Sequence, residues 1–367
     1  LEATMDDLCQ KVWNGERITQ SEAVELSRLP LQQLGALSDR RRQLAKADDY
    51  DGQGNEIVTY ILDRNINYTN VCNVYCKFCA FWRTEKQEGS YVISHEEIDK
   101  KIEETVALGG TQILMQGGHH PKLNKQWYLD LLGHIRDKFP EINIHAFSPS
   151  EFIHFRDVFD EPLESLVRDF RDAGLGSIPG GGGEILVDEV RNRIAPLKAM
   201  TDDWLQVMAV AHKLNMASTA TMMFGHVESI EHRVEHLERV RRQQDETGGF
   251  TAFIAWTFQS ENTKLKAPTV GANEYLRMQA LSRIYLDNVP NIQSSWVTQG
   301  LEIGQVALNY GANDLGSIMI EENVVSEAGT TFCMDEGDMK RLIKDIGYNP
   351  RQRDNWYRLV KSRAEAA

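Results

Sequence analysis

The sequence predicts an α/β protein built as a (β/α)8 barrel of the TIM type, with a helical extension at the N-terminus and a helical tail at the C-terminus. Strand-like and helix-like segments alternate along most of the chain, which is typical of a parallel sheet with crossover helices. The 367 residues, 41% of them hydrophobic, suffice for one barrel with extensions. Polar and glycine-rich stretches follow the strand-like segments, where the functional loops of such barrels lie.

The first 56 residues are predicted to form the helical extension. Ser21 offers a helix N-cap before the apolar Val24 and Leu26, and leucines continue the helical period as far as Leu44. A polar loop over residues 48–55 then precedes a β-branched run, residues 57–62, which is the first predicted strand.

The barrel is expected to span residues 57–322. Its eight predicted strands are residues 57–62, 112–116, 142–147, 176–179, 217–224, 251–258, 291–297 and 314–320. The helices expected between them are residues 95–108, 126–138, 162–173, 202–214, 229–246, 272–287 and 301–310. A partial barrel of six units is the alternative. Residues 323–367 form the predicted tail, in which a helix over 335–346 packs outside the barrel.

Three of the five cysteines lie within eight residues, as Cys72, Cys76 and Cys79 in a Cys-x3-Cys-x2-Cys pattern. Thiolate-only ligation favours zinc or an iron–sulfur cluster over harder cations. A structural zinc site is closed by four ligands, and a [4Fe–4S] cluster ordinarily takes four cysteines. Three thiolates therefore leave one position of a cluster open for chemistry.

Two other uses of these cysteines fit less well. A disulfide framework is disfavoured because three is an odd number and the N-terminal residues do not resemble a secretory signal. A zinc site remains an alternative, with His95 or His119 as the fourth ligand, although no Cys or His follows Cys79 at zinc-finger spacing. The isolated Cys9 and Cys333 are expected to be inert.

The charge balance points to a small-molecule substrate. The chain has 40 Lys and Arg against 54 Asp and Glu, a net charge of −14, which disfavours a nucleic-acid or anionic-membrane partner. The longest apolar run, residues 250–258, is far shorter than the ~20 residues that span a bilayer. We expect a soluble, cytoplasmic protein.

Polar and glycine-rich stretches follow the predicted strands at residues 116–120, 148–151, 179–184, 224–228, 257–259 and 294–299. Gly117 and Gly118 taken alone are equally consistent with an ordinary tight turn. The glycines of 180–183 lack the Lys-Ser/Thr of a Walker A loop. His226 and Glu228, two residues apart at a strand end, face the same way and form a candidate general base, with a solvated loop pair as the alternative.

The cysteine pattern, with the aromatic Phe78 before its last cysteine, resembles the signature of the radical S-adenosylmethionine (SAM) enzymes. The resemblance implies a radical SAM barrel with a [4Fe–4S] cluster on Cys72, Cys76 and Cys79, and SAM on the open iron. An electron from the reduced cluster then cleaves SAM to a 5′-deoxyadenosyl radical. The resemblance also implies a set of residues that contact the cofactors: Phe78, Gly117, Gly118, Ser148, Glu151 and Glu184.

Longer stretches resemble a narrower family within this group, the dehypoxanthine futalosine cyclases of the futalosine route to menaquinone. They are residues 64–72, 80–83, 116–121, 145–149, 177–182, 221–226, 255–259 and 295–300. This resemblance implies abstraction of the C4′ hydrogen of dehypoxanthine futalosine and addition of the carbon radical to the benzoate ring. Aminofutalosine synthase and the deazaflavin (F420 precursor) synthase are the related alternatives. An iron–sulfur or zinc-stabilised binding protein is the non-enzymatic alternative.

The cyclase reaction needs a base, an anion-binding group for the benzoate and contacts to the sugar hydroxyls. The catalytic candidates are His226, Glu228, Tyr68 and His119, and the substrate-binding candidates are Arg83, His120 and Thr298. The expected partners are the small-molecule substrate and an electron donor such as flavodoxin or ferredoxin, with no nucleic acid and no membrane.

Overall fold

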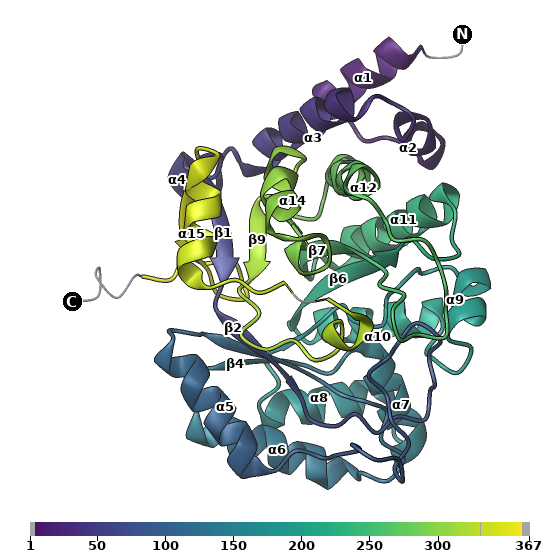
Figure 1. The fold of residues 1–367 in the computed structure, drawn as a ribbon, viewed down its shortest axis with the longest axis vertical. Helices are drawn as coiled ribbons and strands as arrows, with labels where there is room; N and C mark the ends of the chain where they lie inside the picture. The colour runs from purple at the N-terminus through teal and green to yellow at the C-terminus, as the bar shows by residue number, and fades with distance from the viewer. Residues whose placement is uncertain (1–3, 331, 362–367) are drawn as a thin grey trace.

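The computed structural model describes residues 4–330 and 332–361, and its central feature is one sheet of ten strands (Figure 1). Along the sheet the strands are β10 (Asn349–Gln352), β1 (Ile57–Ile61), β9 (Asp314–Ser317), β8 (Asn291–Gln293), β7 (Phe250–Thr257), β6 (Ala217–Phe224), β5 (Ser177–Ile178), β4 (Asn143–Ala146), β3 (Gln112–Gln116) and β2 (Asp63–Asn67). All neighbouring pairs run parallel. The crossover connections of a barrel are therefore in place.

The first strand of the barrel is bent and closes the ring. Only Leu62 separates β1, which pairs with β9 and β10, from β2, which pairs with β3. The chain itself thus joins the two ends of the sheet, and the Ser317 hydroxyl donates to the Asp63 carboxylate at this junction. Counting β1 and β2 as one strand gives eight barrel strands at the eight predicted positions. The predicted (β/α)8 class is confirmed, and the first strand extends five residues beyond its predicted end.

The helices surround this sheet as Figure 1 shows. They are α1 (Met5–Trp13), α2 (Gln20–Leu26), α3 (Leu31–Lys46), α4 (Asp49–Gly52), α5 (His95–Ala107), α6 (Lys125–Lys138), α7 (Pro149–Phe159), α8 (Leu163–Ala173), α9 (Asp188–Ile194), α10 (Thr201–Lys213), α11 (Ile230–Thr247), α12 (Ala272–Tyr285), α13 (Trp296–Gln299), α14 (Leu301–Val306) and α15 (Glu336–Asp345), with 3₁₀ turns at Ala307–Asn309 and Ser326–Ala328. Sequence reasoning missed α7, α9 and α13, and the predicted strand 291–297 ends earlier, because α13 begins at Trp296. The stretch 148–151, interpreted as a loop, is instead the capping box that starts α7.

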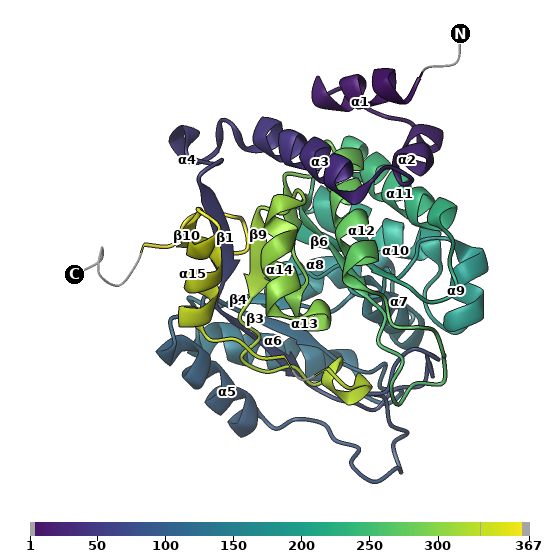
Figure 2. The ribbon, with the colours of Figure 1, turned by 45° about the horizontal axis from the view of Figure 1, so that its top comes forward.

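The N-terminal extension packs against the outside of the barrel, where α3 lies across α12 (Figure 2). The Arg277 guanidinium in α12 donates to the carbonyls of Ser27 and Leu29, just before α3. The extension is therefore fixed to the barrel by partly buried polar contacts as well as by its apolar face. In the described part of the chain no helix is both long enough and apolar enough to cross a membrane.

The C-terminal tail does more than pack outside the barrel as a helix, so that prediction was incomplete. After α15 the chain forms β10 beside β1, and Arg353 then donates to both oxygens of Asp314 at 2.5 and 3.0 Å in the barrel interior. The sequence hides this strand because it is short and contains Pro350, which is typical of an edge strand.

Candidate functional site

The loop that follows β2 presents the three cysteines. The Cys72 amide donates to the Arg83 carbonyl, and the Arg83 amide donates to the Asn70 carbonyl, so residues 70–83 form a closed loop. The Arg83 guanidinium donates to the carbonyls of residues 80–82 and lies 3.5 Å from the Glu327 carboxylate. Arg83, predicted to bind substrate, is thus placed where it holds the cysteine loop in shape, and it does not line the central cavity described below.

The donor set fits an iron–sulfur cluster better than a single ion. All five cysteines are free, and burial raises the pKa of the Cys76 thiol to about 12, with the nearby Cys79 and Cys72 adding to the shift. Among the described residues, no three Cys, His, Asp or Glu side chains converge as the ligands of one metal ion do. A [4Fe–4S] cluster does not need such convergence, because each cysteine binds a different iron. The zinc alternative loses its support, since neither His95 nor His119 closes a ligand set here.

Gly117 and Gly118, at the end of β3, lie under the cysteine loop. A Cβ atom at Gly117 would lie 2.5 Å from the Tyr68 ring. A Cβ atom at Gly118 would lie 2.7 Å from the Val71 carbonyl carbon and 2.9 Å from Cys72 Cβ. Both glycines are therefore required by packing inside the protein. Their predicted approach to SAM stays a prediction.

Glu151 ties this region together. Its carboxylate, 2% exposed, accepts hydrogen bonds from the Tyr68 hydroxyl at 2.7 Å, the Gly117 amide at 3.1 Å, and the amide and hydroxyl of Ser148 at 2.7 Å each. Burial raises the pKa of Glu151, although these donors act in the opposite direction. Tyr68 is fully buried beside Tyr128 and Phe147. Tyr68, Ser148 and Glu151 thus position the glycine pair, and none of them lines the central cavity.

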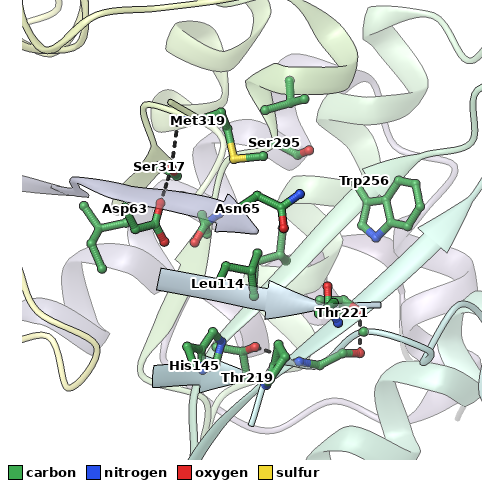
Figure 3. Close-up of a pocket in the computed structure, with 18 of the residues that line it drawn as sticks. Asp63, Asn65, Leu114, His145, Thr219, Thr221, Trp256, Ser295, Ser317 and Met319 are labelled. Atoms are coloured by element: carbon green, nitrogen blue, oxygen red, sulfur yellow. Dashed lines mark hydrogen bonds between the residues drawn. The ribbon is translucent and has the colours of Figure 1, made fainter. Parts of the chain in front are cut away.

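A cavity of about 310 Å³ occupies the barrel interior. Figure 3 shows Asn65, Leu114 and Thr221, from three different strands, pointing into it, with Trp256 at one side and Met319 at another. Most of the side chains at its wall are polar: Asp63, Asn65, Gln112, Gln116, His145, Glu184, Thr219, Thr221, Thr251, Gln293, Ser295, Thr298, Ser317, Glu322, Arg353, Asn355 and Tyr357. An interior so rich in hydrogen-bonding groups suits a polyhydroxylated ligand.

The cysteine loop reaches this cavity through a smaller one of about 60 Å³. Phe78 and Cys79 line the smaller cavity, and Trp256, Val324 and Val325 line both. The first residues of the tail, Val324 and Val325, thus lie where the predicted cluster site and the cavity meet.

Among the predicted contact residues, Glu184 and Thr298 line the cavity. Glu184 is 6% exposed, and its Oε1 accepts from Lys198 Nζ at 2.9 Å while its buried Oε2 has no hydrogen-bond partner. Lys198 also lies 5.2 Å from the Phe78 ring centroid. Burial lowers the pKa of Lys198, but the charges of Glu184 and Cys76 raise it more, so the pKa of this lysine beside the cysteine loop lies above its usual value. Sequence reasoning missed Lys198 because no motif includes it.

His226 and Glu228 lie side by side but outside the lining of the cavity. Their rings and carboxylates are fully buried, with 3.0 Å between His226 Nδ1 and Glu228 Oε2. His226 Nδ1 accepts from the Val227 amide at 2.8 Å, and Nε2 contacts the Met223 carbonyl at 3.1 Å. Glu228 accepts from Arg233 and from two backbone amides. The predicted pairing is present, yet both partners are already engaged by their own loop.

His119 and His120 follow the glycine pair and are buried. The His119 ring lies 5.0 Å from the His154 ring, and burial lowers its pKa well below the usual value. His120 Nδ1 accepts from the amides of Lys122 and Leu123 and so shapes a turn. Neither side chain lines the cavity.

His145, on β4, is the imidazole that does line the cavity (Figure 3). Its Nδ1 is 2.7 Å from the Ser177 hydroxyl, and burial, assisted by Arg353, lowers its pKa to about 3. The position of His145 inside a predicted strand, where alternate residues face the interior, was the available signal in the sequence. Arg353 gave no such signal, because it depends on the unpredicted β10.

Two family models match the chain. Residues 66–240 match the radical SAM superfamily, and residues 247–365 match the CofH/MqnC C-terminal region. The first match contains the cysteine loop and the glycine pair. The second contains β7 to β10 and therefore the tail that reaches the cavity.

Known proteins are similar over most of their length. The chain is 44% identical over 361 residues to a cyclic dehypoxanthine futalosine synthase of Halalkalibacterium halodurans, covering 98% of this chain and 96% of that protein. It is 40% identical over 310 residues to a 5-amino-6-(D-ribitylamino)uracil–L-tyrosine 4-hydroxyphenyl transferase of Archaeoglobus fulgidus, covering 83% and 89%. The crystal structure of methylornithine synthase (PylB) shares the fold, with a TM-score of 0.70 at 17% identity over 94% of this chain and 97% of that one.

Proposed function

Because this chain belongs to the cyclic dehypoxanthine futalosine synthase family of radical SAM enzymes, we propose that it closes dehypoxanthine futalosine to its cyclic form on the route to menaquinone. The observation that carries the proposal is the 44% identity over nearly the whole length of both chains. The cysteine loop beside a polar barrel cavity is the site that such chemistry needs. The chain is accordingly an enzyme, with a [4Fe–4S] cluster and SAM as cofactors.

Cys72, Cys76 and Cys79 would hold the cluster. When bound, the cluster and SAM supply an electron and a 5′-deoxyadenosyl radical that removes a hydrogen atom from the substrate. The protein positions these groups, since the cofactors carry the difficult chemistry. Glu184 is the best-placed contact to SAM, because it lines the cavity wall and its Oε2, 4.0 Å from the Arg191 guanidinium, accepts no hydrogen bond.

The cavity would hold the substrate. Its amide and hydroxyl side chains, among them Asn65, Thr221 and Thr298, suit the sugar hydroxyls, and Trp256 offers a face for the benzoate ring. Arg353 places the positive charge that a carboxylate requires at the cavity wall, although it is already paired with Asp314. Thr298 is the predicted substrate contact that this geometry favours, whereas Arg83 and His120 act through the loops they hold.

An electron and a proton must both leave the benzoate ring when aromaticity is restored, and the oxidised cluster is the acceptor that would take the electron. We propose that His145, whose ring lies at the cavity wall with Ser177 behind it, accepts this proton. With a pKa of about 3 it is a weak base, which suffices here because the ring becomes a strong acid once its electron has left. His226 and Glu228 would need their loop to open before either could reach the ring, and we propose that they position that loop. Tyr68 and His119 likewise support the loops around the cofactors.

The test is anaerobic reconstitution followed by incubation with SAM, dithionite and one of two substrates. We expect cyclic product from dehypoxanthine futalosine. We expect none from tyrosine with 5-amino-6-(D-ribitylamino)uracil, the pair named for the transferase relatives. Replacing Cys72, Cys76 or Cys79 by Ala should abolish deoxyadenosine formation, with Cys333→Ala as the matched control. The proposal is contradicted if the protein turns over the transferase substrates, or if a variant lacking Cys72, Cys76 or Cys79 still cleaves SAM fully.

A further inference from the structure

The end of α9 and the loop before α12 flank the cysteine loop, and each of these three segments carries exposed positive charge. The Lys77 amide donates to the Ile194 carbonyl at 2.9 Å, and the Lys77 carbonyl accepts from the Leu265 amide at 2.8 Å. Residues 193–194 and 264–266 therefore flank Lys77, which stands between Cys76 and Phe78. We use the name cationic rim for four exposed side chains of these segments, Lys77, Arg193, Lys264 and Lys266.

The charges of the cationic rim are not neutralised by the protein. None of the four forms an ion pair with a carboxylate in the described part of the chain, where their polar contacts are to backbone carbonyls such as those of Arg193, Val227 and Ser260. The exposed Glu261, three residues before Lys264 in the same loop, is directed toward Gly329. Four unpaired cations in one place are unusual in a chain with a net charge of −14.

An aromatic pair lies between this surface and Cys76. The exposed Tyr75 ring packs against Trp82 with 5.1 Å between centroids, and Lys264 Nζ lies 5.0 Å from the Trp82 ring. The Trp82 indole N–H donates to the Cys76 carbonyl at 3.3 Å. The exposed side of the cysteine loop is thus connected to the backbone of Cys76 through the Trp82 indole.

We propose that the cationic rim docks an acidic protein that carries one electron at low potential, and that the electron enters the protein here. This rests on the proposed function, since only a cluster at Cys72, Cys76 and Cys79 gives the electron a destination. The transfer is balanced: the reduced carrier loses one electron and the cluster gains it, with no bond made or broken. Charge complementarity favours an acidic carrier, because exposed unpaired cations speed the encounter with an oppositely charged protein.

The experiment compares Arg193→Glu/Lys264→Glu with Lys100→Glu/Lys344→Glu, which makes the same change of net charge at exposed residues of α5 and α15. Each reconstituted protein is reduced either by dithionite or by reduced flavodoxin, and cluster bleaching is followed by stopped-flow absorbance at low and high salt. Binding of oxidised flavodoxin is measured in parallel by anisotropy. The rim variant should lose about 10-fold or more of the flavodoxin rate at low salt. The loss should shrink at high salt, because screening removes the steering.

The two failures are distinguishable. If dithionite neither reduces the cluster nor drives SAM cleavage in the unmodified protein, the proposed function fails. If dithionite works in all proteins but flavodoxin reduces both variants equally fast, or fails to reduce the unmodified protein, the docking surface is refuted. A rim variant with unchanged dithionite-driven SAM cleavage, weaker flavodoxin binding and slower flavodoxin reduction supports it.

Discussion

Substituting Gly118 by Ala adds one methyl group directly under the cysteine loop. The new Cβ would lie 2.7 Å from the Val71 carbonyl carbon and 2.9 Å from Cys72 Cβ, whereas ordinary contact begins at 3.4 Å. The Val71 backbone must therefore move away by at least 0.7 Å, the difference between 3.4 Å and 2.7 Å, because a backbone carbonyl cannot rotate away as a side chain can. Overpacking of this kind costs roughly 1–3 kcal/mol of unfolding free energy.

The larger effect should fall on the cluster. A displacement near 1 Å at a positioned group can cost ~10²-fold in reactivity, since catalytic geometry tolerates only about 0.5 Å. We expect Gly118→Ala to bind less iron and sulfide on reconstitution and to cleave SAM slowly. The measurements are iron and sulfide content, the EPR signal of the reduced cluster, and thermal unfolding before reconstitution.

Gly133→Ala is the matched control. It makes the same substitution in the middle of α6, where the nearest atom to a new Cβ is the flexible Arg136 guanidinium at 3.9 Å. Removing a helical glycine should stabilise the protein by roughly 0.5–1 kcal/mol and leave the cluster intact. Full cluster occupancy and unchanged unfolding in Gly118→Ala would show that the loop can move aside, and the packing argument for this glycine would be wrong.

Three further predictions test the interior of the barrel. His145→Gln should lower the yield of cyclic product by roughly 10²–10⁴-fold while deuterium from C4′ still reaches deoxyadenosine, as expected for loss of a general base. If His226→Gln shows this pattern and His145→Gln does not, His226 is the base. Arg353→Met leaves its buried carboxylate partner unpaired and should lower the unfolding free energy by about 3–5 kcal/mol in denaturant titrations, against ~0–1 kcal/mol for Arg341→Met in an exposed pair. Burial tends to raise the pKa of Glu228, but nearby positive charges and backbone amides outweigh it and hold the pKa below 4.5. The ionised form of Glu228 therefore stabilises the folded protein above about pH 4.5, and this stabilisation is lost as the pH falls through the lower pKa of the folded state. Glu228→Gln should accordingly weaken the fall of the unfolding free energy in acid. An unchanged dependence of the unfolding free energy on pH would contradict this.

The fold was predictable because the barrel strands are buried and regular. All eight strand positions and most helices follow from apolar periodicity, which reports burial of one face or both. Sequence reasoning missed the elements whose residues are typical of a different kind of structure. Ser148 and Glu151 look like a polar loop but cap α7, and Pro350 conceals an edge strand.

The candidate site was predictable only where local spacing carries the chemistry. Three cysteines within one loop indicate a metal centre, because residues so close in the chain must also lie close in space. The cavity wall is different, since Asn65, His145 and Arg353 are brought together by closure of the whole sheet. For His226 and Glu228, the spacing in the sequence correctly predicted that the two side chains pair. It could not predict that their loop would place them outside the lining of the cavity.

The pairing of β1 with β10 bears on the order in which the molecule can be assembled on the ribosome. Ile57 aligns with Asn349, so almost the entire chain must be synthesised before this strand pair can form. A nascent chain that has already emerged with its cysteine loop and glycine-rich loops still lacks Arg353, Asn355 and Tyr357 at the cavity wall. Contacts this distant in sequence make folding slow, because a long loop must close before they form. Newly made protein should therefore acquire its substrate cavity only after residues 349–357 have been added, and a chain cut short before residue 349 should fold much of its barrel yet never enclose the ligand.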